Sequence, residues 1–180
     1  MNVSAGVLSD STPILVGAGQ VVEREANDIS PMALASQAAV NAIKDCEATG
    51  SAAVIAEAID TICVTKLFSD MGRLWAGKCG RSDNPPESIA TCIGASPDHR
   101  IYTQTGGNQP QSRLIEFARA IARGERSVVL MAGAEAIKNQ RHAERNKREL
   151  DWSEQFEEVL EDRGFGESSA TSQEIKNGLY

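Results

Sequence analysis

The strongest constraint on the fold is the alternation of short apolar runs with helical segments over the first 135 residues. The apolar runs are short and rich in β-branched residues, which is typical of strands. The expected strands are residues 13–19, 59–65, 100–104 and 127–132, the first of them buried and ending in a tight glycine turn. Alternation of this kind predicts an α/β fold, a mostly parallel sheet flanked by helices.

Helix signals stand between these runs. Ser30 followed by Pro31 is an N-cap and a first-turn proline, so a helix is expected over 31–46, with an additional short helical turn over 51–58. A short helix over 88–93 ends at Gly94. The clearest amphipathic helix is 110–123, stopped by Gly124, with one apolar face made of Leu114, Phe117, Ala118 and Ile121.

Two regions break the alternation. Residues 66–87 are predicted to form a long loop, with a short helix near 71–76, and loops of this length usually serve function or an interface. After residue 136 the chain becomes basic over 138–148 and acidic over 149–162. Because Trp152, Phe156 and Leu160 recur every four residues, the acidic segment is predicted to be a helix with a narrow apolar stripe.

Composition excludes several classes of protein. The chain has 180 residues, 41% of them hydrophobic, and a net charge of −7. This suits one domain with an appendage and gives no basic surface for nucleic acid or an anionic membrane. No apolar run reaches the roughly 18 to 20 residues that span a bilayer. The N-terminus lacks the features of a secretory signal, so a cytoplasmic location is expected.

Metal and thiol chemistry has little support. The four cysteines form no CxxC pair, only His99 and His142 accompany them, and reduced, mostly buried thiols are expected. His99 is expected at the surface. A nucleophilic thiol needs a basic neighbour or a helix N-terminus, and Cys79, beside Lys78 and Arg81, is the only cysteine with such a setting. The cysteines are Cys46, Cys63, Cys79 and Cys92.

Two glycine motifs remain. Gly17-Ala18-Gly19 begins like a dinucleotide-binding fingerprint, but Val22 stands where the third glycine belongs, which disfavours a nucleotide site. Gly106-Gly107-Asn108 joins an expected strand to an expected helix. Amide groups at such a helix start can hold an anion, an oxyanion or a carbonyl oxygen, and the same residues can equally form a tight turn without a ligand.

The strings together resemble the N-terminal half of thiolase-superfamily proteins. The matching strings are residues 13–20, 31–42, 59–62, 93–95, 105–111 and 120–136. The GGNQPQ string, residues 106–111, is similar to the sterol-carrier-protein thiolase branch, often labelled acetyl-CoA acetyltransferases. The resemblance implies a two-half, five-layered, usually dimeric fold. Here 1–136 would be the N-terminal α/β domain and 137–180 the start of the loop region, truncated relative to the full fold.

The resemblance also implies a site and a substrate class. It places Gly107, or else Gly106, where thiolases carry their nucleophilic cysteine, so no acyl-enzyme is expected there. It implies CoA thioesters as substrates, lipid metabolism as the setting and no separate cofactor. Expected partners are a second copy, a thiolase-type chain or a small OB-fold protein.

Three functions stay open at this stage. The first is an acyl-CoA-processing, acyltransferase-related protein that binds the thioester carbonyl near Gly106, Gly107 and Asn108. The second is a non-catalytic CoA-ester-binding or structural subunit. The third is a subunit of a retro-aldol acyl-CoA lyase, which would need an acid/base group and a hole that polarises the carbonyl.

Overall fold

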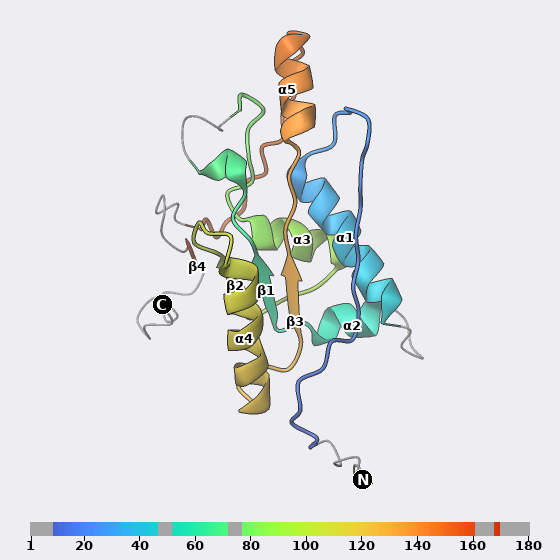
Figure 1. Cartoon of the computed structure of the whole chain (residues 1–180), viewed down its shortest axis with the longest axis vertical. Helices are drawn as coiled ribbons and strands as arrows, with labels where there is room; N and C mark the ends of the chain where they lie inside the picture. Colours follow the sequence, from blue (N-terminus) through green and yellow to red (C-terminus); the bar gives the residue numbers. More distant parts are fainter. Residues whose placement is uncertain (1–8, 47–51, 72–76, 161–167, 170–180) are drawn as a thin grey trace, which may run out of the picture.

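The computed structural model describes residues 9–46, 52–71, 77–160 and 168–169 (Figure 1). Its elements follow the predicted alternation of helices and strands closely from residue 31 to residue 132. In chain order they are α1 (Pro31–Asp45), α2 (Ala52–Ala58), β1 (Thr61–Val64), the 3-10 helix η1 (Phe68–Asp70), α3 (Pro85–Ile93), β2 (His99–Tyr102), α4 (Gln109–Ala122), β3 (Val129–Ala132), α5 (Ile137–Arg145) and β4 (Ser168–Ser169).

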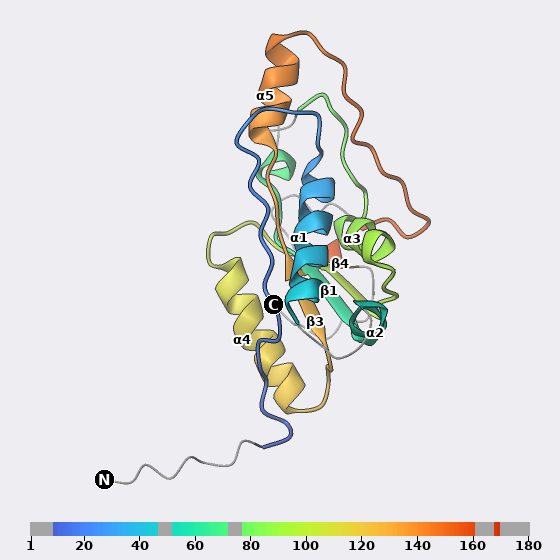
Figure 2. The ribbon, with the colours of Figure 1, turned by 90° about the vertical axis from the view of Figure 1, so that its right-hand side faces the viewer.

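The sheet is mostly parallel, as predicted. Its strand order is β3-β1-β2-β4, in which β1 pairs in parallel with both β2 and β3 and β4 is antiparallel to β2. Figure 2 shows α4 on one side of the sheet and α1 and α3 on the other. The α/β class with a parallel sheet flanked by helices is therefore confirmed.

The core lies around the central strand β1, whose four residues are all buried. Ile62 and Val64 pack toward α1 and α3, where Ile89 is also fully buried. Cys63 faces the other way and packs with Ile101 and with Phe117 of α4. Because both faces of β1 pack against apolar side chains, the strand appears in the sequence as a continuous β-branched run.

The helix ends follow from local chemistry. The Ser30 hydroxyl accepts a hydrogen bond from the Ala33 amide at 3.0 Å and caps α1, as the Ser-Pro pair predicted. Gly94 and Gly124 end α3 and α4 with φ of 72° and 71°, a conformation that glycine adopts without strain. One boundary was wrong: α3 begins at Pro85 rather than at residue 88, because Asn84 caps it and two prolines open its first turn.

The prediction of a buried strand over 13–19 is wrong. These residues form no strand, and Ile14 and Leu15 are 69% and 83% exposed. The segment is instead fixed along α1, where a side chain at Gly19 would meet the Ala38 carbonyl and the Ala18 amide donates to the Asp45 carboxylate at 2.9 Å. Contact with a helix backbone has replaced strand pairing.

The predicted helix over 149–162 is also wrong for its described part. Residues 149–160 run extended, and Glu154 forms a parallel bridge with Ser82. The spacing of four residues between apolar side chains fits an alternating pattern as well as a helical one, which is why the sequence misled. Leu160 is buried in the core and closes this return segment. Residues 161–162 lie outside the described residues.

The long loop is partly as predicted. It contains the 3-10 helix η1 at Phe68–Asp70, just before the short helix expected near 71–76. Residue 71 follows η1 as a bend, and residues 72–76 lie outside the described residues. Among the described helices, none is long and apolar enough to cross a bilayer.

Candidate functional site

The turn Gly106–Asn108 joins β2 to α4 at the end of the sheet to which the parallel strands point. Its Gly106 carbonyl accepts from the Gln109 amide at 3.1 Å, and the Asn108 carbonyl accepts from the Ser112 amide at 3.0 Å. Asn108 occupies the N-cap position of α4, but its side chain makes no capping hydrogen bond. Gly107 and Asn108 are exposed. The start of α4 is therefore open to solvent and is not closed by its own cap.

Gly107 has room for a side chain. A Cβ atom there would have no heavy atom within 4 Å, whereas one at Gly106 would lie 2.7 Å from the Asn108 side-chain oxygen. Neither glycine has a left-handed φ that would strain a substituted residue. Of the two glycines that the resemblance places at the nucleophile position, Gly107 is the one whose missing side chain would point into open space.

This geometry predicts that Gly107→Cys is tolerated and reactive. In a Cys92→Ser background, which removes the exposed native thiol, we expect the free energy of unfolding to change by less than about 0.5 kcal/mol. The introduced thiol should be alkylated by iodoacetamide faster than the remaining cysteines, because a helix N-terminus favours the thiolate. Mass spectrometry of timed reactions measures this. A thiol protected as well as that of Cys63 would contradict the open turn.

A polar cluster lies beyond the ends of β1 and β2. The Tyr102 hydroxyl donates to the Asp70 carboxylate at 2.6 Å and accepts from the Leu67 amide at 3.0 Å. Burial, followed by the charge and hydrogen bond of Asp70, raises the pKa of Tyr102 far above its usual range, against the opposing effect of the Leu67 amide. The hydroxyl therefore stays protonated and acts as a fixed donor to Asp70.

Three further side chains complete this cluster. The Lys66 ammonium lies 5.6 Å from the centre of the Tyr102 ring, and the Lys66 amide donates to the Thr103 hydroxyl at 3.0 Å. The Glu135 carboxylate accepts from the Phe68 amide. Partial burial raises the pKa of Glu135, the Phe68 hydrogen bond lowers it and the Asp70 charge raises it again. The loop 66–70 is thus held to the end of the sheet by Tyr102 of β2, by Thr103 directly after β2 and by Glu135 beyond the end of β3.

Cys79 does not have the activating setting that its neighbours in sequence suggested. Its side chain is buried, and burial, with a contribution from Glu144, raises the pKa of the thiol. It lines a cavity of about 290 Å³ together with Asp70, Arg81 and Trp152. None of Gly106, Gly107 and Asn108 is among the described residues that line this cavity, so the structure does not bring this thiol to the turn.

The other sequence candidates are dispersed. Cys63 is buried, Cys46 is half-buried and Cys92 is exposed, and all four cysteines are free thiols. His99, expected at the surface, is the half-buried first residue of β2. Within the part of the chain that the structure describes, no three His, Cys, Asp or Glu side chains are grouped so that they could hold a metal ion.

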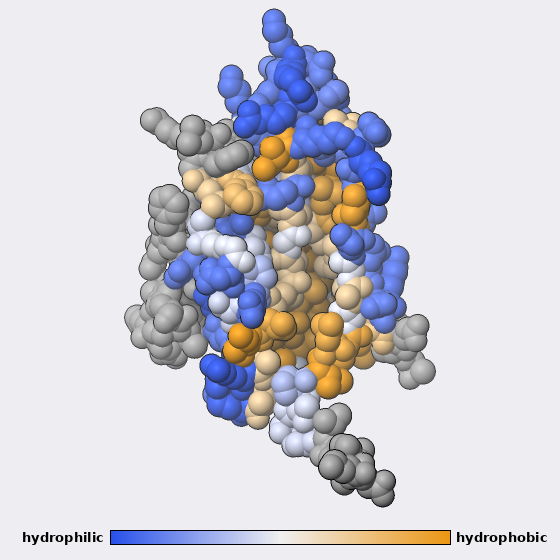
Figure 3. Space-filling model, in the orientation of Figure 1, coloured by the Kyte–Doolittle hydropathy of each residue, from blue (hydrophilic) through white to orange (hydrophobic). Residues whose placement is uncertain are grey.

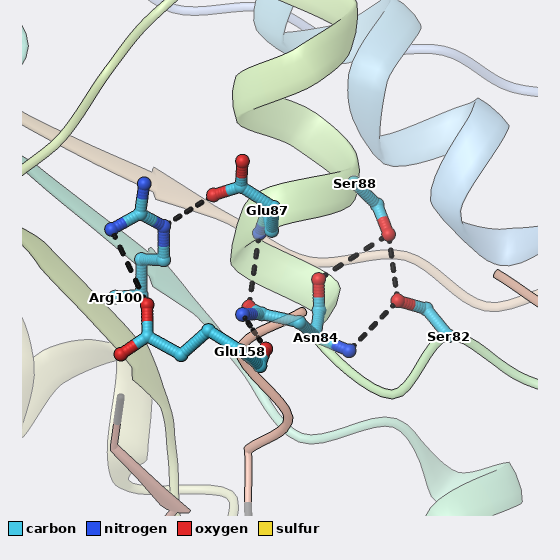
Figure 4. A network of polar contacts seen from close by, with 6 residues as sticks. All are labelled: Ser82, Asn84, Glu87, Ser88, Arg100 and Glu158. Atoms are coloured by element: carbon cyan, nitrogen blue, oxygen red, sulfur yellow. Dashed lines mark hydrogen bonds and ion pairs between the residues drawn. The ribbon is translucent and has the colours of Figure 1, made fainter. Parts of the chain in front are cut away.

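A second polar network is structural (Figure 4). Asn84, which is fully buried, caps α3 by accepting from the Glu87 amide at 3.1 Å and donates to the Glu158 carbonyl at 2.7 Å. Arg100 of β2 forms ion pairs with the Glu87 and Glu158 carboxylates. The Ser82 and Ser88 hydroxyls complete the network at 2.7 Å from each other. The network fastens the return segment to α3 and β2.

The sequence did not indicate the Tyr102–Asp70 pair. The two residues are 32 positions apart, and each is unremarkable in its local sequence. The only signal was the length of the loop 66–87, which favoured a functional or interface role. The turn, in contrast, was indicated directly by a strand, two glycines and an amphipathic helix in succession.

The fold of the chain is a thiolase-like α/β fold, and one comparison supports this directly. The chain is similar to a monomeric SCP2-thiolase-like protein, type 1, from Mycobacterium smegmatis, with 37% sequence identity and a TM-score of 0.59. The match covers 72% of this chain and 24% of that protein. It confirms the resemblance to the thiolase-like, SCP2-type branch. This chain spans about a quarter of the length of that relative.

Two further comparisons found no match. No protein-family model matches the chain, and no curated protein matches it.

Proposed function

We propose that the chain is an acyl-CoA-processing protein of the thiolase-like class whose turn Gly106–Asn108 binds the thioester carbonyl. The observation that carries this proposal is the open, uncapped start of α4 beside a glycine whose side-chain direction is empty. The Gln109 amide already donates to the Gly106 carbonyl and Pro110 has no amide hydrogen, so the donors would be the other amides of the turn and of the first helical turn. Amides at a helix start carry partial positive charge and donate to an oxygen that gains negative charge. The similarity to an SCP2-thiolase-like protein supports the same assignment.

The turn binds and polarises but supplies no nucleophile. When the oxygen of a carbonyl group accepts hydrogen bonds at the helix start, its carbon becomes more electrophilic, which assists acyl transfer and retro-aldol cleavage alike. Neither Gly106 nor Gly107 has a side chain to attack that carbon. Tyr102, the nearest titratable residue along the chain on the β2 side, keeps its proton because its pKa is raised by burial and by Asp70. The attacking or proton-transferring group therefore has to come from elsewhere.

The absence of a side chain at both glycines favours a second candidate function, a non-catalytic subunit that binds CoA esters or supports a catalytic chain. Under either function we propose a cytoplasmic protein that works with a second copy, another thiolase-type chain or a small OB-fold protein. The exposed apolar residues Leu15, Leu114 and Ile115 support association with a partner.

The test is the melting temperature of the 180-residue chain with acetyl-CoA, acetoacetyl-CoA or free CoA. A ligand that binds only the folded state adds about 2.7 kcal/mol at a hundredfold excess over its dissociation constant, a rise of about 5–10 °C for a chain of this size. We expect the two thioesters to produce this rise and free CoA to produce a smaller one, because only the thioesters carry the carbonyl.

The variant Gly107→Leu fills the open space at the turn and should abolish the difference between thioester and free CoA. Ser112→Leu, one turn further along the exposed surface of α4, is the matched control and should keep it. Equal rises with thioesters and free CoA, unchanged by Gly107→Leu, would contradict a carbonyl site at the turn. Thioester cleavage or transfer by the stabilised complex then separates an enzyme from a binding subunit.

A further inference from the structure

The chain passes from β2 to the turn Gly106–Asn108 through Thr103, which is 1% exposed. The Thr103 amide donates to the Val64 carbonyl at 3.0 Å and continues the pairing of β2 with β1 by one residue. On the β1 side, the Lys66 amide then donates to the Thr103 hydroxyl at 3.0 Å. The side chain of Thr103 therefore extends the contact between the two strands beyond their backbone pairing.

The same hydroxyl also holds the next peptide group. It donates to the Gln104 carbonyl at 2.9 Å. A threonine hydroxyl has one proton to donate and lone pairs with which to accept, and here it does both at once. Because Thr103 is also buried and branched at Cβ, its side chain has little rotational freedom. The direction of the Gln104 carbonyl, and with it the approach to the turn, is thus tied to the loop 66–70.

The turn has few contacts of its own that could set its direction. The Asn108 side chain makes no capping bond, and the buried side-chain oxygens of Thr105 and Gln109 have no hydrogen-bond partner. On the face that Figure 3 shows, the surface over the start of α4 is hydrophilic to neutral, and hydrophobic side chains gather instead between α4 and α1. Within the described residues, the orientation of the turn therefore depends mainly on how the chain leaves β2.

We propose that Thr103 is a positioning residue for the turn Gly106–Asn108: its hydroxyl fixes the direction in which the chain leaves β2 and thereby aims the amides of the turn at the thioester carbonyl. This inference rests on the carbonyl-binding role proposed above for the turn. Thr103 acts through the turn and not on the carbonyl, because its hydroxyl is buried and bonded on both sides. Donors stabilise a developing charge only when they are fixed in place, so an error of about 1 Å in their position costs much of the effect.

The first test follows the turn without any ligand. Gly107→Cys in the Cys92→Ser background places a thiol at the start of α4, and its rate of alkylation by iodoacetamide reports how well the helix start favours the thiolate. Thr103→Val keeps the shape of the side chain and removes the hydroxyl. Added to this background, it should lower the alkylation rate at pH 7 by about threefold or more, because the thiol is no longer held at the helix start. Thr103→Ser keeps the hydroxyl, and its rate should stay within about 1.5-fold.

A control separates the orientation of the turn from a general loss of stability. Asn84→Ala weakens the fold at the start of α3 and leaves the Thr103 hydroxyl in place, so it should leave the alkylation rate unchanged. Circular dichroism shows whether each variant folds. If Thr103→Val does not fold, Thr103→Ala gives the same comparison, because it removes the hydroxyl without placing a second methyl group against the Lys66 amide.

The second test connects Thr103 to the carbonyl through the melting temperatures with acetyl-CoA and with free CoA. Thr103→Val should remove at least half of the difference between the two ligands, and Thr103→Ser should keep it. A wild-type chain that shows no such difference would contradict the function proposed for the turn, while the alkylation rates still decide whether Thr103 orients it. An alkylation rate that Thr103→Val leaves unchanged, or that Thr103→Ser or Asn84→Ala lowers equally, would overturn the inference, as would a ligand difference that survives in Thr103→Val.

Discussion

Replacing Asn84 with alanine is expected to lower the free energy of unfolding by about 1–3 kcal/mol. Loss of an N-cap costs about 1 kcal/mol, and loss of the hydrogen bond to the partly buried Glu158 carbonyl costs about 0.5–1.5 kcal/mol more. Both losses occur here, because Asn84 caps α3 at Glu87 and donates to the Glu158 carbonyl from a fully buried position. Urea denaturation followed by circular dichroism measures the change.

One variant separates the contribution of the N-cap from that of the bond to Glu158, and a second serves as the control. Asn84→Ser keeps a side-chain oxygen that can cap α3 but is too short to keep the bond to Glu158, so its loss should be smaller than that of alanine. Asn108→Ala is the matched control, because Asn108 stands at the same helix position of α4 without a capping bond. It should change the free energy of unfolding by less than about 0.5 kcal/mol. Equal losses for Asn84→Ala and Asn108→Ala would contradict the network.

The Asn84 network shows why the course of the C-terminal segment could not be predicted from its own sequence. The segment 149–160 has the charge and spacing of a helix, yet it runs extended where Asp83 and Asn84 offer hydrogen bonds to Phe156, Leu160 and Glu158. Those partners are more than 70 residues away in the chain. The domain boundary after residue 136 stays a prediction.

Local sequence signals were sufficient to predict those helix ends whose stabilising contacts lie close by in the sequence. The Ser30 cap and the glycine stops at 94 and 124 act within one helical turn, and they placed the helices well. The run 13–19 was misassigned because its strand-like composition says nothing of which partner it meets. Two glycines let it approach α1 closely, and the tertiary contact decided its conformation.

The candidate site likewise has one part that the local sequence predicts and one part that it does not. Residues 106–108 could be predicted because a strand, a glycine pair and a helix start are consecutive in sequence. Tyr102 and Asp70 could not, because they meet only once β1 and β2 lie parallel and bring their ends to one edge of the sheet. Because the sheet topology brings these two residues together, no regular spacing between them in the sequence indicates the pair.

Replacing Tyr102 with phenylalanine is the second change with a large expected effect, a loss of about 2–4 kcal/mol of unfolding free energy at pH 7. The hydroxyl bonds a carboxylate whose side chain is 8% exposed, and hydrogen bonds to charged groups contribute about 1.5–3 kcal/mol. The Leu67 amide, which donates to the same hydroxyl, would also lose its acceptor. Urea denaturation of both proteins gives the difference.

The pH dependence of this loss identifies its cause. Since the pKa of Tyr102 is raised in the folded state, the unfolded chain releases the phenolic proton first, near pH 10. The contribution of Tyr102 is therefore complete below pH 10 and declines as the pH rises above it, so the gap between wild type and Tyr102→Phe should narrow there. In Asp70→Asn, where the charge that opposes ionisation is gone, the decline should still begin near pH 10 but level off at a lower pH, because the pKa of Tyr102 in the folded state is raised less. A gap close to zero at pH 7 would show that packing of the ring, and not its hydroxyl, stabilises the end of the sheet, and a gap that stays constant from pH 7 to 11 would contradict the raised pKa of Tyr102 in the folded state.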